Sequence, residues 1–340
     1  MYKIIVAGCG MVADWWLEIV LKRDDCQVVG LVDRNIDQAL AKKASYNLEA
    51  GTYTSIEAAL EKEDANLVFD LTAPGAHHNI TTTALKAGCH VFGEKPMSDS
   101  IENAEKMVQA AIDTGREYFV MQNRRYVPGV VSMKDFLRTD TLGAIGQVSV
   151  SFQLDPHFGG FREEMESPLI ADMAIHTFDA ARFITGKNPV SVYCHEYNPP
   201  WSWYKGDAAA VCIFEMEDGT VFDYRGSWCA NGLNTSWESE WRVACAKGAL
   251  FWDGNEQLYY DLKDSTTKIG LASENNVKSN HIAIPIKPQP FGGHEMCIAE
   301  MFEALKNGTR PQTDCRDNIN SIRMVYKAME SARTKKVVTL

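Results

Sequence analysis

The first third of the chain alternates between short apolar runs and amphipathic segments, which is the pattern of strands joined by helices. The predicted strands are KIIVAG, QVVGLVD, NLVFDLT, CHVFGE and YFVMQ. The predicted helices are IDQALAKKASY, IEAALEK and IENAEKMVQAAIDTG. Because strands that are apolar throughout are buried on both faces, this order indicates a parallel sheet covered by helices. We therefore expect an α/β fold whose N-terminal part, residues 1–122, is a doubly wound Rossmann domain.

The pattern changes after residue 122, where apolar and polar residues begin to alternate. The predicted strands are then VSVSFQL, VSVYCHEY, DAAAVCIFEM, TVFDYRGSW, WRVACA and LYYDL. Helices are predicted at VVSMKDFLRT, at 169–185 with Gly186 as C-terminal cap, at HEMCIAEMFEALKNG and at NINSIRMVYKAMESAR. Residues 123–340 are therefore expected to form an α+β domain with a large, mostly antiparallel sheet. Whether its last helices pack back on the first domain is left open.

Net charge and cysteine content indicate which partners the protein is expected to lack and in which compartment it is expected. A net charge of -11 would repel nucleic acid and an anionic bilayer, so neither is expected as a partner. The apolar opening is interrupted by glycines, Asp14 and Glu18 and is too short to span a membrane. The nine cysteines are scattered and contain no C-x-x-C pair, which indicates reduced thiols. We expect a cytoplasmic protein without a metal site.

The segment from Gly8 to Ala13 reads G-x-G-x-x-A between a predicted strand and a predicted helix. In dinucleotide-binding turns the first glycine permits a tight turn, Gly10 lets the backbone approach a pyrophosphate, and Ala13 keeps helix and strand close. The first helical residues, Met11 and Val12, would direct N–H groups and the positive end of the helix dipole at the phosphates. The segment therefore predicts a dinucleotide cofactor.

The residues that end the second strand indicate which dinucleotide is bound. Asp33 would accept hydrogen bonds from the ribose hydroxyls of the adenosine, and its charge would oppose a 2'-phosphate. Arg34 follows it and is able to stack on adenine or to bind that phosphate, but it is as compatible with a solvated surface position. NAD is therefore expected, and NADP is left open.

Two further segments resemble a known family. Thr72, Pro74, His78 and above all Glu94-Lys95-Pro96 resemble the signatures of the Gfo/Idh/MocA oxidoreductases, the group of glucose-fructose oxidoreductase and inositol dehydrogenase. ADMAIHTFDAARFITG resembles the D-x-x-x-H-x-x-D helix of that family, and MQNRRYVPG its interdomain segment. The resemblance implies an NAD(P)-dependent dehydrogenase acting on a secondary hydroxyl of a sugar, glycoside or cyclic polyol. It also implies that the C-terminal sheet is open, binds substrate and forms a homo-oligomer, a dimer or tetramer.

The resemblance gives roles to residues of the first domain. Lys95 would hydrogen-bond the reacting hydroxyl, and Glu94 would lie on the nicotinamide side, both at the carboxyl edge of the sheet. Thr72, Pro74 and His78 would contribute to the cofactor cleft, whereas His77 is expected to be a solvated residue at a helix start.

Three polar residues of the second domain recur at helical spacing. Asp172, His176 and Asp179 would lie on one face of the predicted helix. His176 is the predicted proton acceptor, and Asp172 would orient it or bind a substrate hydroxyl. Asp179 is as compatible with a structural role.

Further residues are candidates for substrate binding. The resemblance places a substrate-facing or interdomain arginine at Arg124 or Arg125 without deciding between the two, and Arg125 is included among the candidates. The loop LDPHFGGFREE contributes His157 and Phe158, and NPPWSWYKGD contributes Trp203 beside Trp201 and Tyr204. Aromatic faces pack against the C–H faces of sugars, but the same rings would also suit an oligomer interface.

Two other functions remain open from the sequence. An enzyme with tightly bound NAD would use it transiently for an elimination, an epimerisation or a glycosidic cleavage, and a non-catalytic module would sense nicotinamide. The identity of the substrate and the carbon that is oxidised depend on loops that the sequence does not bring together.

Overall fold

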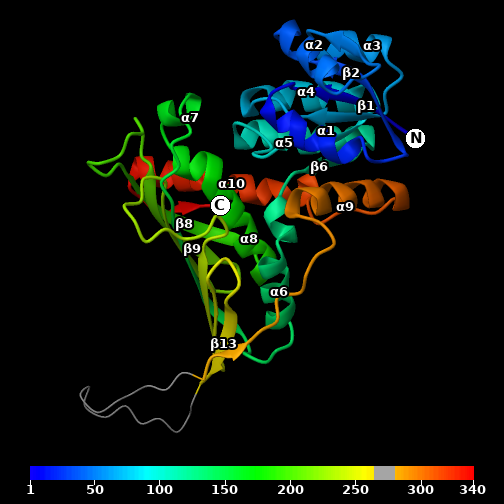
Figure 1. The fold of residues 1–340 in the computed structure, drawn as a ribbon. Coiled ribbons are helices and arrows are strands. Elements are labelled where there is room, and N and C mark those ends of the chain that lie inside the picture. Colours follow the sequence, from blue (N-terminus) through cyan, green and yellow to red (C-terminus); the bar gives the residue numbers. More distant parts are fainter. Residues whose placement is uncertain (264–279) are drawn as a thin grey trace, which may run out of the picture. The chain divides into compact units, whose positions relative to one another are not determined.

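The computed structural model describes residues 1–263 and 280–340 (Figure 1). This part of the chain forms two compact units. The first comprises residues Met1–Asn123 and His294–Ile322, and the second comprises Arg124–Gly293 and Arg323–Leu340. The last long helix, α10, Cys315–Thr334, therefore begins in the first unit and ends in the second.

The first unit contains a six-stranded parallel sheet in the order β3-β2-β1-β4-β5-β6. Its strands are β1 Tyr2–Ala7, β2 Cys26–Val32, β3 Gly51–Tyr53, β4 Leu67–Asp70, β5 His90–Gly93 and β6 Tyr118–Val120. The chain runs outward from β1 to β3, then returns to β4 on the other side of β1. Such a reversal leaves a crevice at the carboxyl ends of β1 and β4, where nucleotides bind in sheets of this kind.

Helices connect these strands and bury their apolar sides against the sheet. They are α1 Met11–Val20, α2 Ile36–Ser45, α3 Ile56–Lys62, α4 Pro74–Lys86 and α5 Ile101–Thr114, with α9 Gly293–Asn307 added from the end of the chain. On α9, Phe302 packs against Phe69 of β4 and Phe92 of β5. A segment remote in sequence thus completes the core of the first unit.

The second unit contains a nine-stranded sheet in the order β14-β13-β12-β11-β7-β10-β9-β8-β15. Its strands are β7 Ile145–Gln153, β8 Pro189–Tyr197, β9 Ala209–Met216, β10 Val221–Ser227, β11 Glu240–Cys245, β12 Gly248–Trp252, β13 Leu258–Leu262, β14 Ile282–Ala283 and β15 Val338–Thr339. Among the described residues its strand pairs are antiparallel except for β7 with β10. The prediction of a Rossmann-type domain plus a mostly antiparallel α+β domain is confirmed.

One face of the nine-stranded sheet is covered by helices. The helical segments of the second unit are η1 Asn123–Tyr126, α6 Pro128–Leu137, α7 Phe161–Glu164, η2 Leu169–Ala174 and α8 Ile175–Thr185, with the end of α10. Phe178 of α8 meets Phe214, Phe222 and Tyr224 of the sheet edge to face. In Figure 1, α6 and α8 lie on the same side of β8 and β9. The burial pattern alternates along β8 and β9, so their other face is exposed.

The helix predicted at 169–185 is not uniform. Residues Leu169–Ala174 form a π-helix, and the α-helix runs over Ile175–Thr185 with Gly186 as its C-terminal cap, whose φ of 69° is left-handed. The hydrophobic pattern carries no signal for the wider turn. A π-helical turn within a helix is frequent at functional sites, and here it holds Asp172 immediately before the turn that carries His176.

Candidate active site

The glycine turn joins β1 to α1 as expected. Gly8 has a φ of +93°, and a Cβ there would lie 2.5 Å from the carbonyl oxygen of Leu71, so only glycine fits. Gly10 is the residue before α1, and a Cβ on it would meet nothing within 4 Å. The N-terminus of α1, with Met11 and Val12, therefore borders open space that suits a pyrophosphate.

Asp33 follows β2 and is held by the backbone. One carboxylate oxygen accepts the N–H of Cys9 and the other accepts the N–H of Asn35, each at 2.9 Å. Cys9 lies inside the glycine turn, so this carboxylate is fixed beside the place where the turn would receive a dinucleotide. Arg34 is exposed to solvent.

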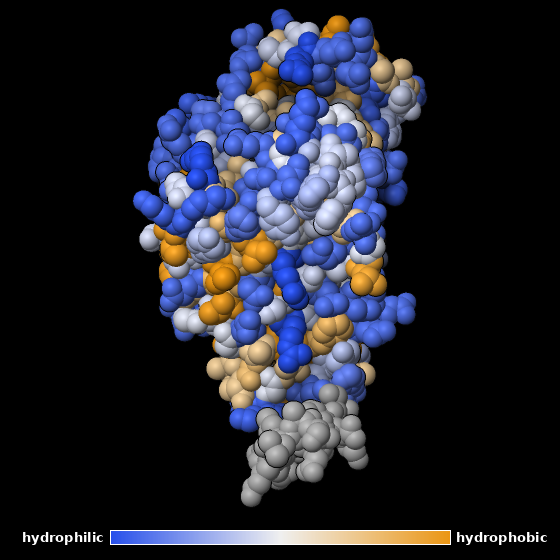
Figure 2. Space-filling model, turned by 90° about the vertical axis from the view of Figure 1, so that its left-hand side faces the viewer, coloured by the Kyte–Doolittle hydropathy of each residue, from blue (hydrophilic) through white to orange (hydrophobic). Residues whose placement is uncertain are grey.

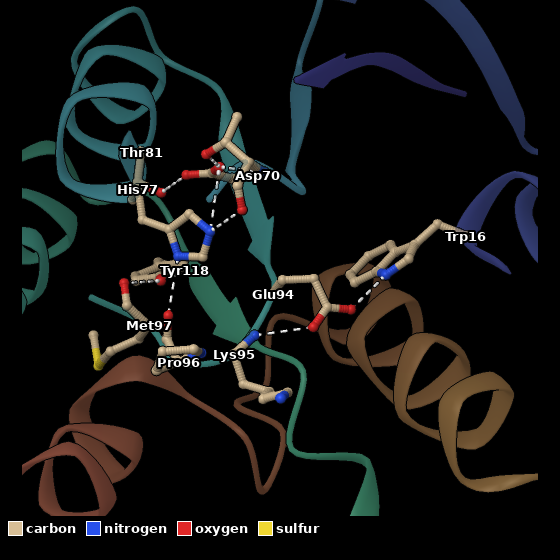
Figure 3. A network of polar contacts seen from close by, with 10 residues as sticks. Trp16, Asp70, His77, Thr81, Glu94, Lys95, Pro96, Met97 and Tyr118 are labelled. Atoms are coloured by element: carbon tan, nitrogen blue, oxygen red, sulfur yellow. Dashed lines mark hydrogen bonds and ion pairs between the residues drawn. The ribbon is translucent and has the colours of Figure 1, made fainter. Parts of the chain in front are cut away.

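The Glu94-Lys95-Pro96 segment follows β5. Glu94 is 8% exposed, and its Oε1 accepts a hydrogen bond from the indole N–H of Trp16 at 2.9 Å. Its Oε2 accepts the backbone N–H of Lys95 at 3.1 Å (Figure 3). The peptide between Lys95 and Pro96 is cis, and Lys95 is half-buried. The carboxylate of Glu94 is thus oriented by Trp16, a residue of α1 that no motif marks.

His77 does not lie where the sequence predicted it. The expectation of a solvated histidine is wrong, because the side chain is 1% exposed. Its Nδ1 lies 3.0 Å from the carbonyl oxygen of Pro96, and its Nε2 lies 2.8 Å from that of Thr72. The signal was helical spacing, since His77 shares the buried face of α4 with Thr81, Ala84 and Leu85.

The other cofactor candidates of this region lie around the start of α4. Pro74 is the first residue of α4. The hydroxyl of Thr72 donates to the carboxylate of Asp70, at the end of β4, at 2.6 Å. His78 is half-buried, and its carbonyl accepts a hydrogen bond from the hydroxyl of Thr82. Neither the strand pattern nor a motif in the sequence predicted a role for Asp70.

In the second unit His176 borders a small hollow. The side chain is 8% exposed. The lining residues are Arg124, Val130, His176, Thr177, Ala180, Trp237, Glu238 and Trp241. Arg124 forms an ion pair with Glu238 across this lining. The hollow therefore combines one imidazole, one ion pair and two indole rings, of which the sequence identified only His176 and, as an alternative, Arg124.

The remaining polar candidates of the helix have separate ion pairs. The carboxylate of Asp172 accepts a hydrogen bond from Nε of Arg162 at 2.6 Å. Asp179 is fully buried and binds both Nε and Nη2 of Arg125 at 2.7 Å, with Arg182 at 3.6 Å. The arginine that lines the hollow is thus Arg124, whereas Arg125 is 5% exposed and paired with Asp179. These contacts favour the structural role for Asp179.

Aromatic side chains from three loops gather near Arg162. His157 stacks on Trp203 with ring centroids 3.6 Å apart. Phe158 is 45% exposed, packs against Trp237 and receives the guanidinium of Arg162 on its face. The face of Trp203 is therefore occupied by His157, and the exposed ring in contact with a residue of the hollow is Phe158 rather than Trp203.

Neither a membrane-spanning helix nor a cluster of metal ligands is found among residues 1–263 and 280–340. In these ranges no helix has the length and apolar character needed to cross a membrane. In the same ranges no three side chains of histidine, cysteine, aspartate or glutamate come together as a metal site would require.

The fold and the site of the first unit define an NAD-binding oxidoreductase with a Rossmann domain. Residues 2–122 match the family model described as "Oxidoreductase family, NAD-binding Rossmann fold", and residues 130–251 match the GFO/IDH/MocA C-terminal domain. The chain belongs to the Gfo/Idh/MocA oxidoreductase family, as its motifs predicted, and NAD is its cofactor.

Relatives cover nearly the whole chain. D-apiose dehydrogenase of Paraburkholderia graminis is 24% identical over 100% of this chain and 90% of that protein. The 1,5-anhydro-D-fructose reductase of Ensifer adhaerens is 26% identical over 96% and 95% of the two chains. An oxidoreductase from Agrobacterium radiobacter, solved with NAD+, L-tartaric acid and magnesium, superposes with a TM-score of 0.85, 18% identity and coverage of 99% and 98%. The structural match supports the fold alone.

Proposed function

We propose that the protein is an NAD-dependent dehydrogenase that transfers a hydride between nicotinamide and a secondary hydroxyl of a sugar, glycoside or cyclic polyol. The observation that carries this proposal is Lys95, which follows the oriented carboxylate of Glu94 at the carboxyl edge of a sheet with a dinucleotide turn. The relatives named D-apiose dehydrogenase and 1,5-anhydro-D-fructose reductase support the substrate class.

Oxidation of an alcohol needs a hydride acceptor, a group that stabilises the reacting oxygen and a proton acceptor, and we assign each to a different group. NAD, when bound, supplies the hydride acceptor. The ammonium group of Lys95 hydrogen-bonds the reacting oxygen and stabilises its developing negative charge. The imidazole of His176 accepts the hydroxyl proton, and Asp172 positions His176 or binds a neighbouring hydroxyl. The cofactor is bound by three groups of residues. The pyrophosphate is bound by Gly8, Gly10, Met11 and Val12. The adenosine is bound by Asp33 and Arg34, and the nicotinamide half is bound by Thr72, Pro74, His78 and Glu94.

We assign substrate binding to residues of the second unit. The hollow beside His176 offers the Arg124–Glu238 ion pair to sugar hydroxyls and the rings of Trp237 and Trp241 to C–H faces. The exposed ring of Phe158 extends this apolar surface. The other candidates for substrate binding, His157, Trp203 and Arg125, have partners of their own, since His157 stacks on Trp203 and Arg125 pairs with Asp179.

A substrate screen tests the function. Sugars, glycosides, inositols and their keto forms are incubated with NAD+ or NADH, and nicotinamide absorbance and product formation are followed together. We expect that at least one compound causes a net oxidation or reduction of the nicotinamide, seen as a lasting change in its absorbance. Product without net change would replace the proposal by transient redox chemistry, and NADH binding without turnover of any compound would favour a sensing module.

The cofactor preference gives a prediction at Asp33. Asp33→Ala removes two acceptor oxygens near the ribose site and a charge that opposes a 2'-phosphate, so the Kd of NADH should rise about tenfold while that of NADPH stays equal or falls. Nicotinamide fluorescence measures both constants. Asp37→Ala, an exposed carboxylate in the first turn of α2, is the control and should change neither. Equal loss of both cofactors would contradict a preference set by Asp33.

We also propose that the protein is a cytoplasmic homo-oligomer with a Rossmann domain at 1–122 and a second domain at 123–340, of which residues 294–322 pack with the first domain. The uncovered face of the large sheet supports the oligomer, since Val190, Tyr193 and Tyr197 of β8, Val211 and Ile213 of β9, and Val221 of β10 are each 36–48% exposed. Figure 2 shows hydrophobic residues gathered between hydrophilic ones on one side of the molecule. Contiguous apolar surface of this kind marks an interaction site.

The sheet face gives a second prediction. Ile213→Asp places a charge opposite Tyr193, its cross-strand neighbour, and should shift the protein from dimer or tetramer to monomer. Light scattering after size exclusion reads the mass. Leu40→Asp, which alters an equally exposed leucine of α2 in the first unit, should leave the assembly intact. An unchanged mass for Ile213→Asp would place the interface elsewhere.

A further inference from the structure

We propose that His77 is held as a doubly protonated imidazolium and is a positioning residue for Lys95. The inference rests on the proposed function for its catalytic meaning, but the protonation state is a property of the chain itself. His77 touches neither substrate nor cofactor in this proposal, and it acts through the backbone of the Glu94-Lys95-Pro96 segment.

The two partners of the ring require two donors. Both nitrogens of His77 lie within hydrogen-bond distance of carbonyl oxygens, 3.0 Å for Pro96 and 2.8 Å for Thr72 (Figure 3). A carbonyl oxygen only accepts, and a neutral imidazole carries one N–H and one lone pair. In either neutral tautomer one lone pair would face another in a site that is 1% exposed. With both nitrogens protonated, both contacts are charge-assisted hydrogen bonds.

A buried positive charge needs a buried negative partner, and Asp70 supplies it. Its Oδ1 lies 3.9 Å from Nε2 of His77, and the residue is 0% exposed. The hydroxyl of Thr72 donates to Oδ1 at 2.6 Å and that of Thr81 donates to Oδ2 at 2.8 Å, so both oxygens are used as acceptors. The imidazolium and the carboxylate then form a neutral pair within the first unit.

The other titratable group beside this pair stays neutral. The hydroxyl of Tyr118 donates to the carbonyl of Met97 at 3.4 Å. Burial, with a contribution from the charge of Asp70, raises the pKa of Tyr118 well above its usual value. Tyr118 therefore adds no negative charge, and the counter-ion of His77 is Asp70.

The position of the ring explains what it does. Thr72 lies just beyond β4, and Pro96 directly follows Lys95 in the chain, so one side chain joins the neighbouring strand end to the Lys95 segment. On the other side of Lys95, Glu94 is joined to Trp16. The backbone of Lys95 is thus held through both adjacent residues, and loss of either hold would displace the ammonium group.

The protonation state is tested without a substrate. In the full chain labelled with ¹⁵N-histidine, NMR of the ring nitrogens at pH 7.5 distinguishes imidazolium from either neutral tautomer. His90 is the internal comparison: its Nδ1 accepts the N–H of Glu117, and burial lowers its pKa, so it should give a neutral signal. His77 should show two protonated nitrogens, assigned by their loss in His77→Gln. One unprotonated nitrogen in His77 overturns the proposal, even if NADH binds.

The positioning role is tested with variants. His77→Phe removes both hydrogen bonds and His77→Gln retains one, so kcat with the best compound of the screen should fall about 100-fold and about 10-fold. The KM of that compound and the Kd of NADH should change less than about twofold, because Lys95 acts on the transition state. His90→Gln, a control at a half-buried histidine of the same unit, should keep kcat. Equal kcat for wild type and His77→Phe refutes positioning; absence of NADH binding by the wild type refutes the proposed function instead.

Discussion

Replacing Lys95 by methionine is expected to lower kcat by a factor of about 10³ while the Kd of NADH changes little. Methionine keeps the length of the side chain and removes the ammonium group that stabilises charge on the reacting oxygen. Since that charge develops during the reaction, the loss should fall on kcat and kcat/KM together. Steady-state rates of nicotinamide reduction and fluorescence titration with NADH measure the two effects.

Two variants make the result specific. Lys86→Met removes an exposed lysine at the end of α4 and should keep full turnover. Lys95→Arg retains the positive charge but replaces the compact ammonium by a planar guanidinium, so only partial activity is expected. If Lys95→Met kept more than about a tenth of the rate, the transition-state role of this ammonium would be disproved.

Replacing Asp179 by alanine is expected to lower the free energy of unfolding by about 3–5 kcal/mol. The variant would leave the guanidinium groups of Arg125 and Arg182, 5% exposed each, without the buried carboxylate that they share. Denaturation with urea, followed by circular dichroism, gives the change. The loss should be the same with and without NADH, because the cofactor binds to the first unit.

An exposed ion pair provides the matched control. Lys187 and Asp218 lie 3.7 Å apart with side chains 39% and 38% exposed, so Asp218→Ala should cost less than about 1 kcal/mol. A similarly small loss for Asp179→Ala would mean that the buried arginines find other partners. In that case the assignment of a structural role to Asp179 would be withdrawn.

The architecture was accessible from the sequence because hydrophobic period and turn chemistry agree over long stretches. The segment VSVYCHEY predicted a strand that the structure extends by one residue to Pro189–Tyr197, and its alternation gave the exposed face correctly. The elements that escaped prediction are short. Among the strands, β12 has five residues, β3 has three, and β14 and β15 have two each, too few for a clear period to appear. Pairing with a neighbouring strand, rather than their own sequence, defines them.

The candidate site could be predicted from the sequence only in part, since a motif identifies a residue but not the side chains that contact it. Gly8 and Gly10 lie between β1 and α1, and Asp33 and Glu94 directly follow β2 and β5, as the strand pattern predicted. The cofactor contacts of these residues and the roles of Lys95 and His176 stay predictions. Trp16, Asp70 and Glu238 act through contacts with residues remote in sequence, and a single sequence carries no record of these. The prediction for His77 was wrong because His77 and His78 are adjacent in sequence but point to different sides of α4, and only His77 lies on its buried face.

The π-helical turn at Leu169–Ala174 sets the angle between the residues on its two sides. A π-helical turn closes with i→i+5 hydrogen bonds and so holds one more residue than an α-helical turn. Because an α-helix advances by about 100° per residue, one extra residue rotates the segment before the turn around the helix axis relative to the segment after it. Arg162 precedes this turn and His176 follows it, so the direction of His176 relative to the preceding segment is not the one that regular α-helical spacing would give.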